Sequence, residues 1–298
     1  MLKPTLRRAL VWAAFTFVAA QAADADAARV GVLSNKFFAE TAADFNANVG
    51  GHSFTGIDVG AVPPLLATLT SNYDVLLLFE DSTFANAPNV GNVVAAFAAT
   101  GRPVVLGTFY DQDRSDSLAT TIPHGWGTLE TIDPNTTDGN STPYIPSFGY
   151  GLRTLNASTL VASPLTSGVT SLTSAKYAGG NDAKPGTVIV AAWTQPNARG
   201  KIDPAIDYRV TGLSCVIHVA IAPQYPSIGT VGVDFGGDFY RAWKNSFDLA
   251  ANSCIVATAG SALGIPTLSS VGLALTALLV AAIGYLARRR PVQPPRRR

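Results

Sequence analysis

Basic side chains are scarce in the body of this 298-residue chain, and acidic side chains are absent from both of its ends. Nine of the 21 Lys and Arg residues lie in residues 1–8 and 288–298, whereas no Asp or Glu lies in 1–22 or 265–298. The segment between the ends therefore has 12 basic and 20 acidic side chains. Phosphate backbones are bound by clustered Lys and Arg, so this acidic body argues against a nucleic-acid partner.

Residues 1–22 have the composition of a secretory signal peptide. They contain a charged start, an apolar centre and a small-x-small cleavage site, formed by Lys3, Arg7 and Arg8, by Ala9–Ala20, and by Ala20-Gln21-Ala22. We expect the Sec translocon to export the chain and the signal to be removed. A retained N-terminal anchor is the alternative, but the apolar run is short for a membrane span.

The C-terminal segment Ile265–Arg290 contains an apolar run, Val271–Ala287, that has no charge. Seventeen residues form a helix of about 25 Å, and the hydrocarbon core of a bilayer is about 30 Å thick. The run therefore predicts one short transmembrane helix. Arg288, Arg289 and Arg290 follow it directly, and the positive-inside rule holds such a cluster in the cytoplasm. The basic residues 291–298 would then be a cytoplasmic tail.

The same segment resembles the IPTL-CTERM sorting tail of exported proteins from Gram-negative bacteria. The matching residues are Ile265, Pro266, Thr267, Leu268, Ser269 and Gly272, whereas Ser270 and Val271 replace the usual Glu and Trp. The resemblance implies processing by an exosortase-type membrane enzyme. It also implies a transient inner-membrane anchor and a final location in the periplasm, at the cell surface or outside the cell. An ordinary C-terminal anchor is the alternative.

Between the two ends, residues 28–256 predict one α/β domain, followed by a small-residue linker at 257–264. Strands and helices alternate in its first part, which favours a parallel sheet covered by helices on both faces, a three-layer flavodoxin-like arrangement. The predicted strands are 29–33, 53–59, 73–79 and 103–107, and the predicted helices are 37–49, a short one opened by Pro63 and Pro64, and 89–100. The absence of a fixed-period repeat disfavours a solenoid or propeller.

The second part of the body is less regular. Residues 122–160 are rich in Pro, Gly, Thr and Asn, which predicts long loops with short strands. Further strands are expected at 187–193, 215–222 and 229–235. A last helix is expected at 238–253, where aromatic residues recur at helical spacing.

Acidic side chains follow several of the predicted strands. In a parallel sheet, ligands bind at the carboxyl ends of the strands, which places Glu80, Asp81, Asp111 and Asp113 in a candidate cleft. His124 and Asp238 are further candidates. The segment that begins at Asp111 also resembles the start of a calcium loop, but Asp116 and Ile122 replace the required Gly and Glu. We favour a helix-capping connection there and predict no metal site and no cofactor; a cation bound by Asp111 and Asp113 is the alternative.

Only two cysteines are present, Cys215 and Cys254. In an oxidising compartment an isolated pair is a candidate disulfide, and it would stabilise the fold by roughly 3–4 kcal/mol if unstrained. Two buried free thiols are the alternative, because the sequence does not reveal the Cα–Cα distance that a disulfide requires. Since Cys215 and His218 are three residues apart on a predicted strand, they should point to opposite faces.

The stretch Gly101–Tyr110 resembles the nucleophile turn of class I glutamine amidotransferase-like domains, which is close to P-V-L-G-I-C-x-G. Pro103–Gly107 match, but Phe109 stands at the cysteine position and Asp111 at the following glycine. A second motif, G-V-x-F-H-P-E, aligns with Gly232–Asp238. There the histidine position is Gly236, and Asp238 approximately keeps the acid.

The resemblance thus implies an amidotransferase-like fold without its catalytic cysteine and histidine. Acyl transfer through cysteine needs a thiolate and a nearby imidazole, so the sequence predicts a non-enzymatic protein with a binding or structural role in the cell envelope or extracellular matrix. Its extracellular ligand is not identifiable from the residues. The alternative is a secreted hydrolase that acts on carbohydrate or peptide through Asp111, Asp113, His124 or Asp238, with or without a cation.

Overall fold

The computed structural model describes residues 27–82, 84–110, 125–136, 150–177, 181–197, 199–252 and 254. The chain divides into two units, Met1–Val256 and Ala257–Arg298, and all described residues belong to the first. The predicted signal peptide (1–22), linker (257–264), sorting segment (265–290) and basic tail (291–298) lie outside the described residues. Within the described ranges, no helix is both long and apolar enough to cross a membrane.

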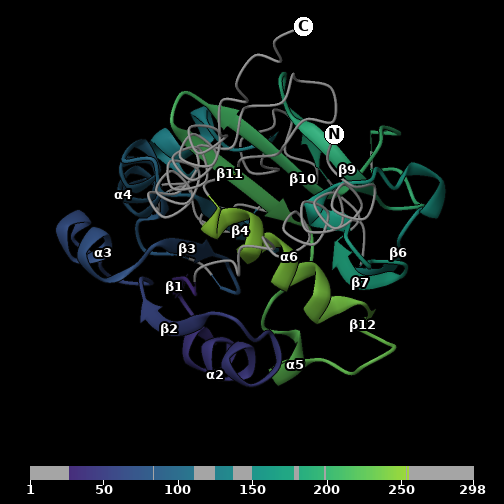
Figure 1. Ribbon diagram of the computed structural model, residues 1–298, viewed down its shortest axis with the longest axis horizontal. Helices are drawn as coiled ribbons and strands as arrows, with labels where there is room; N and C mark the ends of the chain where they lie inside the picture. The colour runs from purple at the N-terminus through teal and green to yellow at the C-terminus, as the bar shows by residue number, and fades with distance from the viewer. Residues whose placement is uncertain are drawn as a thin grey trace, which may run out of the picture. The chain divides into compact units, whose positions relative to one another are not determined.

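A seven-stranded sheet forms the centre of the domain (Figure 1). Its first five strands are mutually parallel, and the last two are antiparallel to their neighbours. Among the parallel strands, the spatial order is that of doubly wound flavodoxin-like sheets. In order across the sheet, the strands are β2 (Ser53–Asp58), β1 (Arg29–Ser34), β3 (Val75–Leu78), β4 (Val104–Gly107), β11 (Ser214–Val219), β10 (Pro204–Thr211) and β9 (Val188–Ala192).

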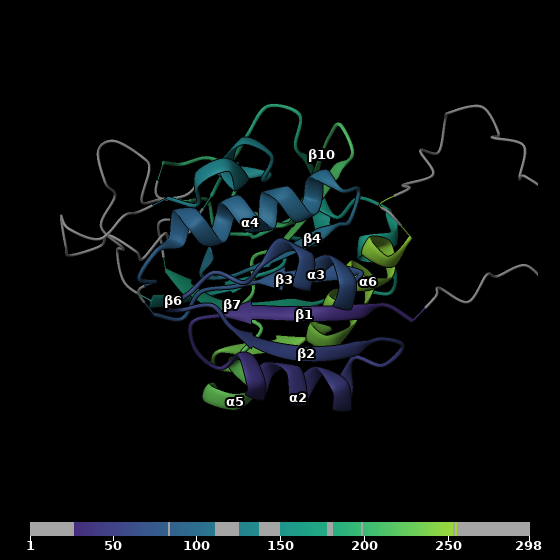
Figure 2. The same cartoon turned by 90° about the vertical axis from the view of Figure 1, so that its left-hand side faces the viewer.

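Helices cover both faces of this sheet, which confirms the layered α/β prediction. They are α2 (Phe38–Asn48), α3 (Leu66–Asn72), α4 (Ala87–Ala99), α5 (Tyr225–Ile228) and α6 (Phe239–Ala251). Figure 2 shows α4 on one side of the sheet and α2 and α5 on the other. Strand β3 explains the two cores: Leu76 and Leu78 belong to the core of α3 and α4, while Val75 and Leu77 belong to that of α2 and α6. A strand buried on both faces has no polar alternation.

Aromatic side chains build the core between α2, α6 and the sheet. On α6, Phe239, Trp243 and Phe247 recur every four residues and so share one buried helix face. The Trp243 ring lies 5.5 Å from that of Phe45 on α2, and the Phe247 ring lies 5.0 Å from that of Phe54 on β2. These contacts fasten the last helix to the first part of the chain.

Two smaller sheets complete the domain. One has three antiparallel strands, in the order β12 (Phe235–Gly237), β7 (Leu172–Tyr177) and β6 (Tyr150–Thr154). An isolated bridge from Leu155 to Trp193 brings it beside the β9 end of the large sheet (Figure 1). The other pairs β5 (Asn135–Thr136) with β8 (Asp182–Ala183). Short 3-10 helices lie at Gly127–Thr131 (η3), Ala157–Thr159 (η5) and Pro164–Thr166 (η6).

The strand predicted at 229–235 is wrong, because most of this segment is a turn. Gly232 has φ +81°, a left-handed conformation that suits glycine. The Asp234 carboxylate closes the turn by accepting a 2.7 Å hydrogen bond from the Thr230 backbone N–H. Alternating valines suggested a strand, yet Val231 and Val233 are exposed and only Phe235 enters β12.

Candidate functional site

The carboxyl ends of β1 and β3 meet where the sheet topology switches direction. From β1 the chain runs to β2 on one side, while β3 lies on the other side of β1. Crevices at such switch points are where open α/β sheets bind ligands. Here Asn35, directly after β1, accepts hydrogen bonds at Oδ1 from the backbone N–H groups of Asp81 (3.2 Å) and Ser82 (3.4 Å). Asn35 Nδ2 also donates to the Ser82 carbonyl.

Two of the predicted cleft residues lie at this switch point. Glu80 is fully buried, and its carbonyl accepts a 3.1 Å hydrogen bond from the Phe109 N–H. The Asp81 carboxylate is partly exposed and accepts a 3.0 Å hydrogen bond from Gln224 Nε2, with Lys36 Nζ 3.8 Å away. The site thus combines a buried acid, a hydrogen-bonded carboxylate and an exposed cation. Sequence reasoning missed Gln224, although it is the first polar residue after the predicted strand at 215–222.

The positions aligned with the amidotransferase cysteine and histidine lie in packed surroundings. Phe109 is buried in the core that α2 and α6 share with the sheet. Gly236 lies in β12, where it pairs with Thr173 of β7. A Cβ atom at Gly236 would be only 2.8 Å from Thr173 Oγ1, so a larger side chain there would require Thr173 to move.

Asp238 serves a local structural purpose at the start of α6. Its Oδ2 accepts hydrogen bonds from the Thr170 N–H (2.7 Å), the Thr170 hydroxyl (2.9 Å) and the Ser171 N–H (3.0 Å). Burial would raise the pKa of Asp238, but these hydrogen bonds outweigh it and the pKa is lowered. The carboxylate therefore remains ionised and ties the 170–171 loop to the helix.

The other three cleft candidates, Asp111, Asp113 and His124, lie outside the described residues. Among the described residues, no three His, Cys, Asp or Glu side chains are arranged to hold a metal ion. Among the described residues, the candidate ligand sites are the switch point, a buried polar triad and a surface hollow.

A buried polar triad lies on the α4 side of strands β10 and β11. Asp207 and His218 are opposite each other in the ladder, with Asp207 Oδ1 3.3 Å from His218 Nδ1. Asn135 Nδ2 lies 2.9 Å from both Asp207 Oδ2 and His218 Nδ1. All three side chains are buried. Sequence reasoning missed this group for two reasons. Asn135 is 72 residues from Asp207 and 83 residues from His218 in the sequence. In addition, β10 was not recognised as a strand.

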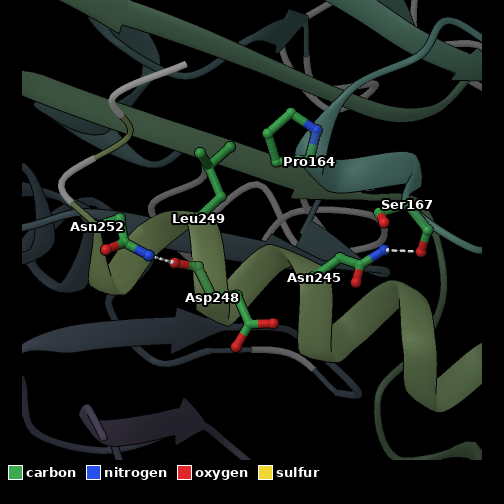
Figure 3. A pocket seen from close by; sticks show the side chains of 6 residues that line it. All are labelled: Pro164, Ser167, Asn245, Asp248, Leu249 and Asn252. Carbon is green, nitrogen blue, oxygen red and sulfur yellow. Dashed lines mark hydrogen bonds between the residues drawn. The ribbon is translucent and has the colours of Figure 1, made fainter. Parts of the chain in front are cut away.

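A surface hollow of about 550 Å³ lies between η6 and α6 (Figure 3). Pro164, Ser167, Asn245, Asp248, Leu249 and Asn252 line it. Asn245 Nδ2 donates to the Ser167 carbonyl at 2.9 Å, which connects the two walls. The sequence offered no sign of this hollow, since η6 and α6 are far apart along the chain.

Behind the hollow, the buried His52 orients Asp248. His52 Nδ1 accepts a 3.2 Å hydrogen bond from the Ala28 N–H, so the ring proton is on Nε2, which lies 3.1 Å from Asp248 Oδ1. Lys244 donates to both oxygens of the same carboxylate at 2.8 Å. Burial lowers the pKa of His52 despite its acidic partner, which favours a neutral imidazole.

Cys215 and Cys254 form a disulfide, which answers the question that the sequence left open. Their Cα atoms are 6.2 Å apart, a separation that a disulfide can span. The bond joins β11, an interior strand of the sheet, to Cys254, three residues after the end of α6. As expected from the strand spacing, Cys215 lies in the core on one face and His218 in the polar triad on the other.

An IPTL-CTERM motif is present at residues 264–290. The match covers the tail and not the α/β body. It supports the predicted sorting signal of an exported, surface-directed chain and implies processing by an exosortase-type enzyme. No curated protein matches the chain.

Three solved structures are similar to the body, each at 12% sequence identity. The carbohydrate deacetylase Agd3 and a β-galactosidase from Bacillus circulans sp. alkalophilus each match 76% of this chain with a TM-score of 0.43. The matches span only 33% and 30% of those two proteins. A putative ThuA-like protein from Bacteroides uniformis ATCC 8492 matches 74% of this chain and 89% of its own length, with a TM-score of 0.42. At these scores, none of the three assigns an activity to this chain.

Proposed function

We propose that this chain is an exported, surface-sorted protein whose amidotransferase-like α/β domain binds a ligand or supports the cell envelope or extracellular matrix without catalysing a reaction. A cleaved signal peptide at 1–22 directs it to the Sec translocon. The apolar tail then holds it in the inner membrane until an exosortase-type enzyme removes the sorting segment. The mature domain resides in the periplasm, at the cell surface or outside the cell.

One observation carries the non-catalytic part of this proposal. The aligned nucleophile position is the buried Phe109, and the aligned histidine position is Gly236, against which Thr173 packs. Cysteine-based acyl transfer needs a thiolate and an imidazole that activates it. This chain supplies neither at those positions, and its two cysteines are joined to each other.

A direct assay tests this part. The purified chain is expected to release no ammonia from glutamine above the buffer rate. Ammonia release that disappears in a Glu80→Gln variant, but remains in an Asp58→Asn variant at the exposed end of β2, would show turnover that depends on Glu80. That outcome would contradict the proposal.

Mass spectrometry of the mature C-terminus in the native host tests the sorting part. We expect the C-terminus to lie near residues 265–270 in the wild type. A Pro266→Ala/Thr267→Ala variant should keep its tail and accumulate in the membrane fraction, whereas Ser261→Ala in the linker should be processed normally. An intact Arg298 in the wild-type membrane fraction would mean that the tail is only an anchor.

A further inference from the structure

Lys184 and Asp133 form an ion pair at an unusual place, inside the polar interior between segment 125–136 and the sheet. Lys184 lies in the turn between β8 and β9, and its Nζ contacts Asp133 Oδ1. The Asp133 side chain is fully buried, and that of Lys184 is 19% exposed. Removing one carboxylate and one ammonium from water is costly. This pair therefore needs an explanation beyond a surface salt bridge.

The surroundings hold both groups in one position. Lys184 Nζ also donates a 2.7 Å hydrogen bond to the Glu130 carbonyl. On the other side, the Tyr110 hydroxyl donates a 2.8 Å hydrogen bond to Asp133 Oδ2. Tyr110 is buried and stacked on the buried Trp126, with ring centroids 5.0 Å apart. The amine thus faces a carboxyl group whose second oxygen already has a hydrogen-bond donor.

We propose that Lys184 and Asp133 are joined by an amide bond between Nζ and Cγ, an intramolecular isopeptide crosslink. The proposal rests on the contact of an amine with a fully buried carboxyl group, whose other oxygen accepts a hydrogen bond from the buried Tyr110. The bond would fasten segment 125–136 to the β8–β9 turn. Without it, the β5–β8 ladder that joins these segments has only two residue pairs.

The bond forms by condensation and needs no oxidant or other reactant. Within the ion pair, Lys184 transfers one proton to Asp133, which gives a neutral amine and a carboxylic acid. The nitrogen lone pair attacks Cγ, and Tyr110 stabilises the developing charge on Oδ2 by its hydrogen bond. The bond from Cγ to Oδ1 then breaks, and Oδ1 leaves as water with two of the three original ammonium protons. One proton remains on the amide nitrogen.

The electrostatics of the site favour the reactive, uncharged forms. Burial raises the pKa of Asp133 to about 6, although Lys184 and Tyr110 act in the opposite direction. A buried carboxyl group with a raised pKa takes up a proton more readily, and a neutral amide replaces two buried charges. Because the Asp133 side chain is fully buried, water has little access to the carbonyl carbon of the product amide.

A peptide map of the full chain tests the crosslink. Trypsin cuts after Arg114, Arg153, Lys176 and Arg199, and Pro185 blocks cleavage after Lys184. After reduction, denaturation and digestion, we expect a branched species that joins peptides 115–153 and 177–199. Its mass should be the sum of the two peptides less one water, and its fragments should place the branch at residues 133 and 184.

Two arginine substitutions provide matched variants. Lys184→Arg retains the positive charge but cannot form the amide, so the two peptides should separate. Lys201→Arg changes an exposed lysine that pairs with Asp182, and its branched species should remain. If the wild type yields only the two linear peptides at full mass, the pair is an ion pair and the proposal is wrong. This test uses the wild type alone, so it does not require any variant to fold.

Discussion

The two faces of the central sheet are stabilised in different ways. On the α2 and α6 face, aromatic rings and a disulfide hold the layers together, and the main polar feature is the linked set His52, Asp248 and Lys244. On the other face, which α4 covers, buried polar side chains connect segment 125–136 to strands β10 and β11. The comparison teaches that one sheet can combine a face held by aromatic packing and a disulfide with a face whose apolar core also encloses buried polar side chains.

The largest effect is expected from the packed face. Trp243→Ala removes a fully buried ring and leaves a cavity between α6 and α2, which should lower the free energy of unfolding by about 3–5 kcal/mol. Urea unfolding measures this change. Val233→Ala, at an exposed turn, should change it by less than about 0.5 kcal/mol. Equal effects of the two variants would mean that α6 packing does not stabilise the domain.

The second largest effect on the free energy of unfolding is expected from loss of the disulfide. A Cys215→Ser/Cys254→Ser variant is expected to lose roughly 2–4 kcal/mol, because the bond closes a loop with a sequence separation of 39 residues. Unfolding curves with and without a reducing agent measure this loss. Reductant should destabilise the wild type and leave the double variant unchanged. A wild type that is insensitive to reductant under denaturing conditions would contradict the prediction.

The polar face is tested by Asp207→Ala. This change leaves Asn135 and His218 buried with fewer partners, and each unsatisfied buried group costs about 1–3 kcal/mol. We expect a loss of about 2–3 kcal/mol in urea unfolding. Asp58→Ala, at the exposed end of β2, is the matched control. If both variants lose the same small amount, then pairing within the triad does not stabilise this face.

The smallest expected effect is a pH dependence on the packed face. Because burial lowers the folded-state pKa of His52, the unfolded chain takes up a proton first as the pH falls. Stability from this group is therefore present above the unfolded pKa of about 6.5 and decreases as the pH falls below it. Two charged groups also act on the ring: Asp248 raises the pKa of His52, and Lys244 lowers it. Unfolding curves between pH 7.5 and 5.5 should show this slope in the wild type and a flatter one in His52→Gln.

Local patterns predicted much of the first half of the fold. Buried strands such as Val75–Leu78 and amphipathic helices such as Ala87–Ala99 depend mainly on residues near in sequence, so their periodicity is visible in one chain. The turn at 229–235 shows the limit. There apolar residues at alternate positions are typical of a strand, but backbone hydrogen bonds and a bond that the Asp234 carboxylate accepts from the Thr230 N–H form a turn instead.

The candidate site was only partly predictable for the same reason. Glu80 and Asp81 directly follow an obvious strand, so their place at the carboxyl edge could be expected. Gln224 reaches Asp81 from 143 residues away. Asp238 looked like a cleft residue but bonds the 170–171 loop, because β12 pairs with β7 and not with the large sheet.

By itself, the sequence determined the sorting motif at residues 264–290 and the α/β class of this protein, because both depend on patterns within short stretches. Only the tertiary structure decided which distant side chains meet. The pairing of Cys215 with Cys254, the triad of Asn135, Asp207 and His218, and the contact of Lys184 with Asp133 all depend on long-range strand order. That order results from the packing of whole layers, and no single stretch of the sequence encodes it.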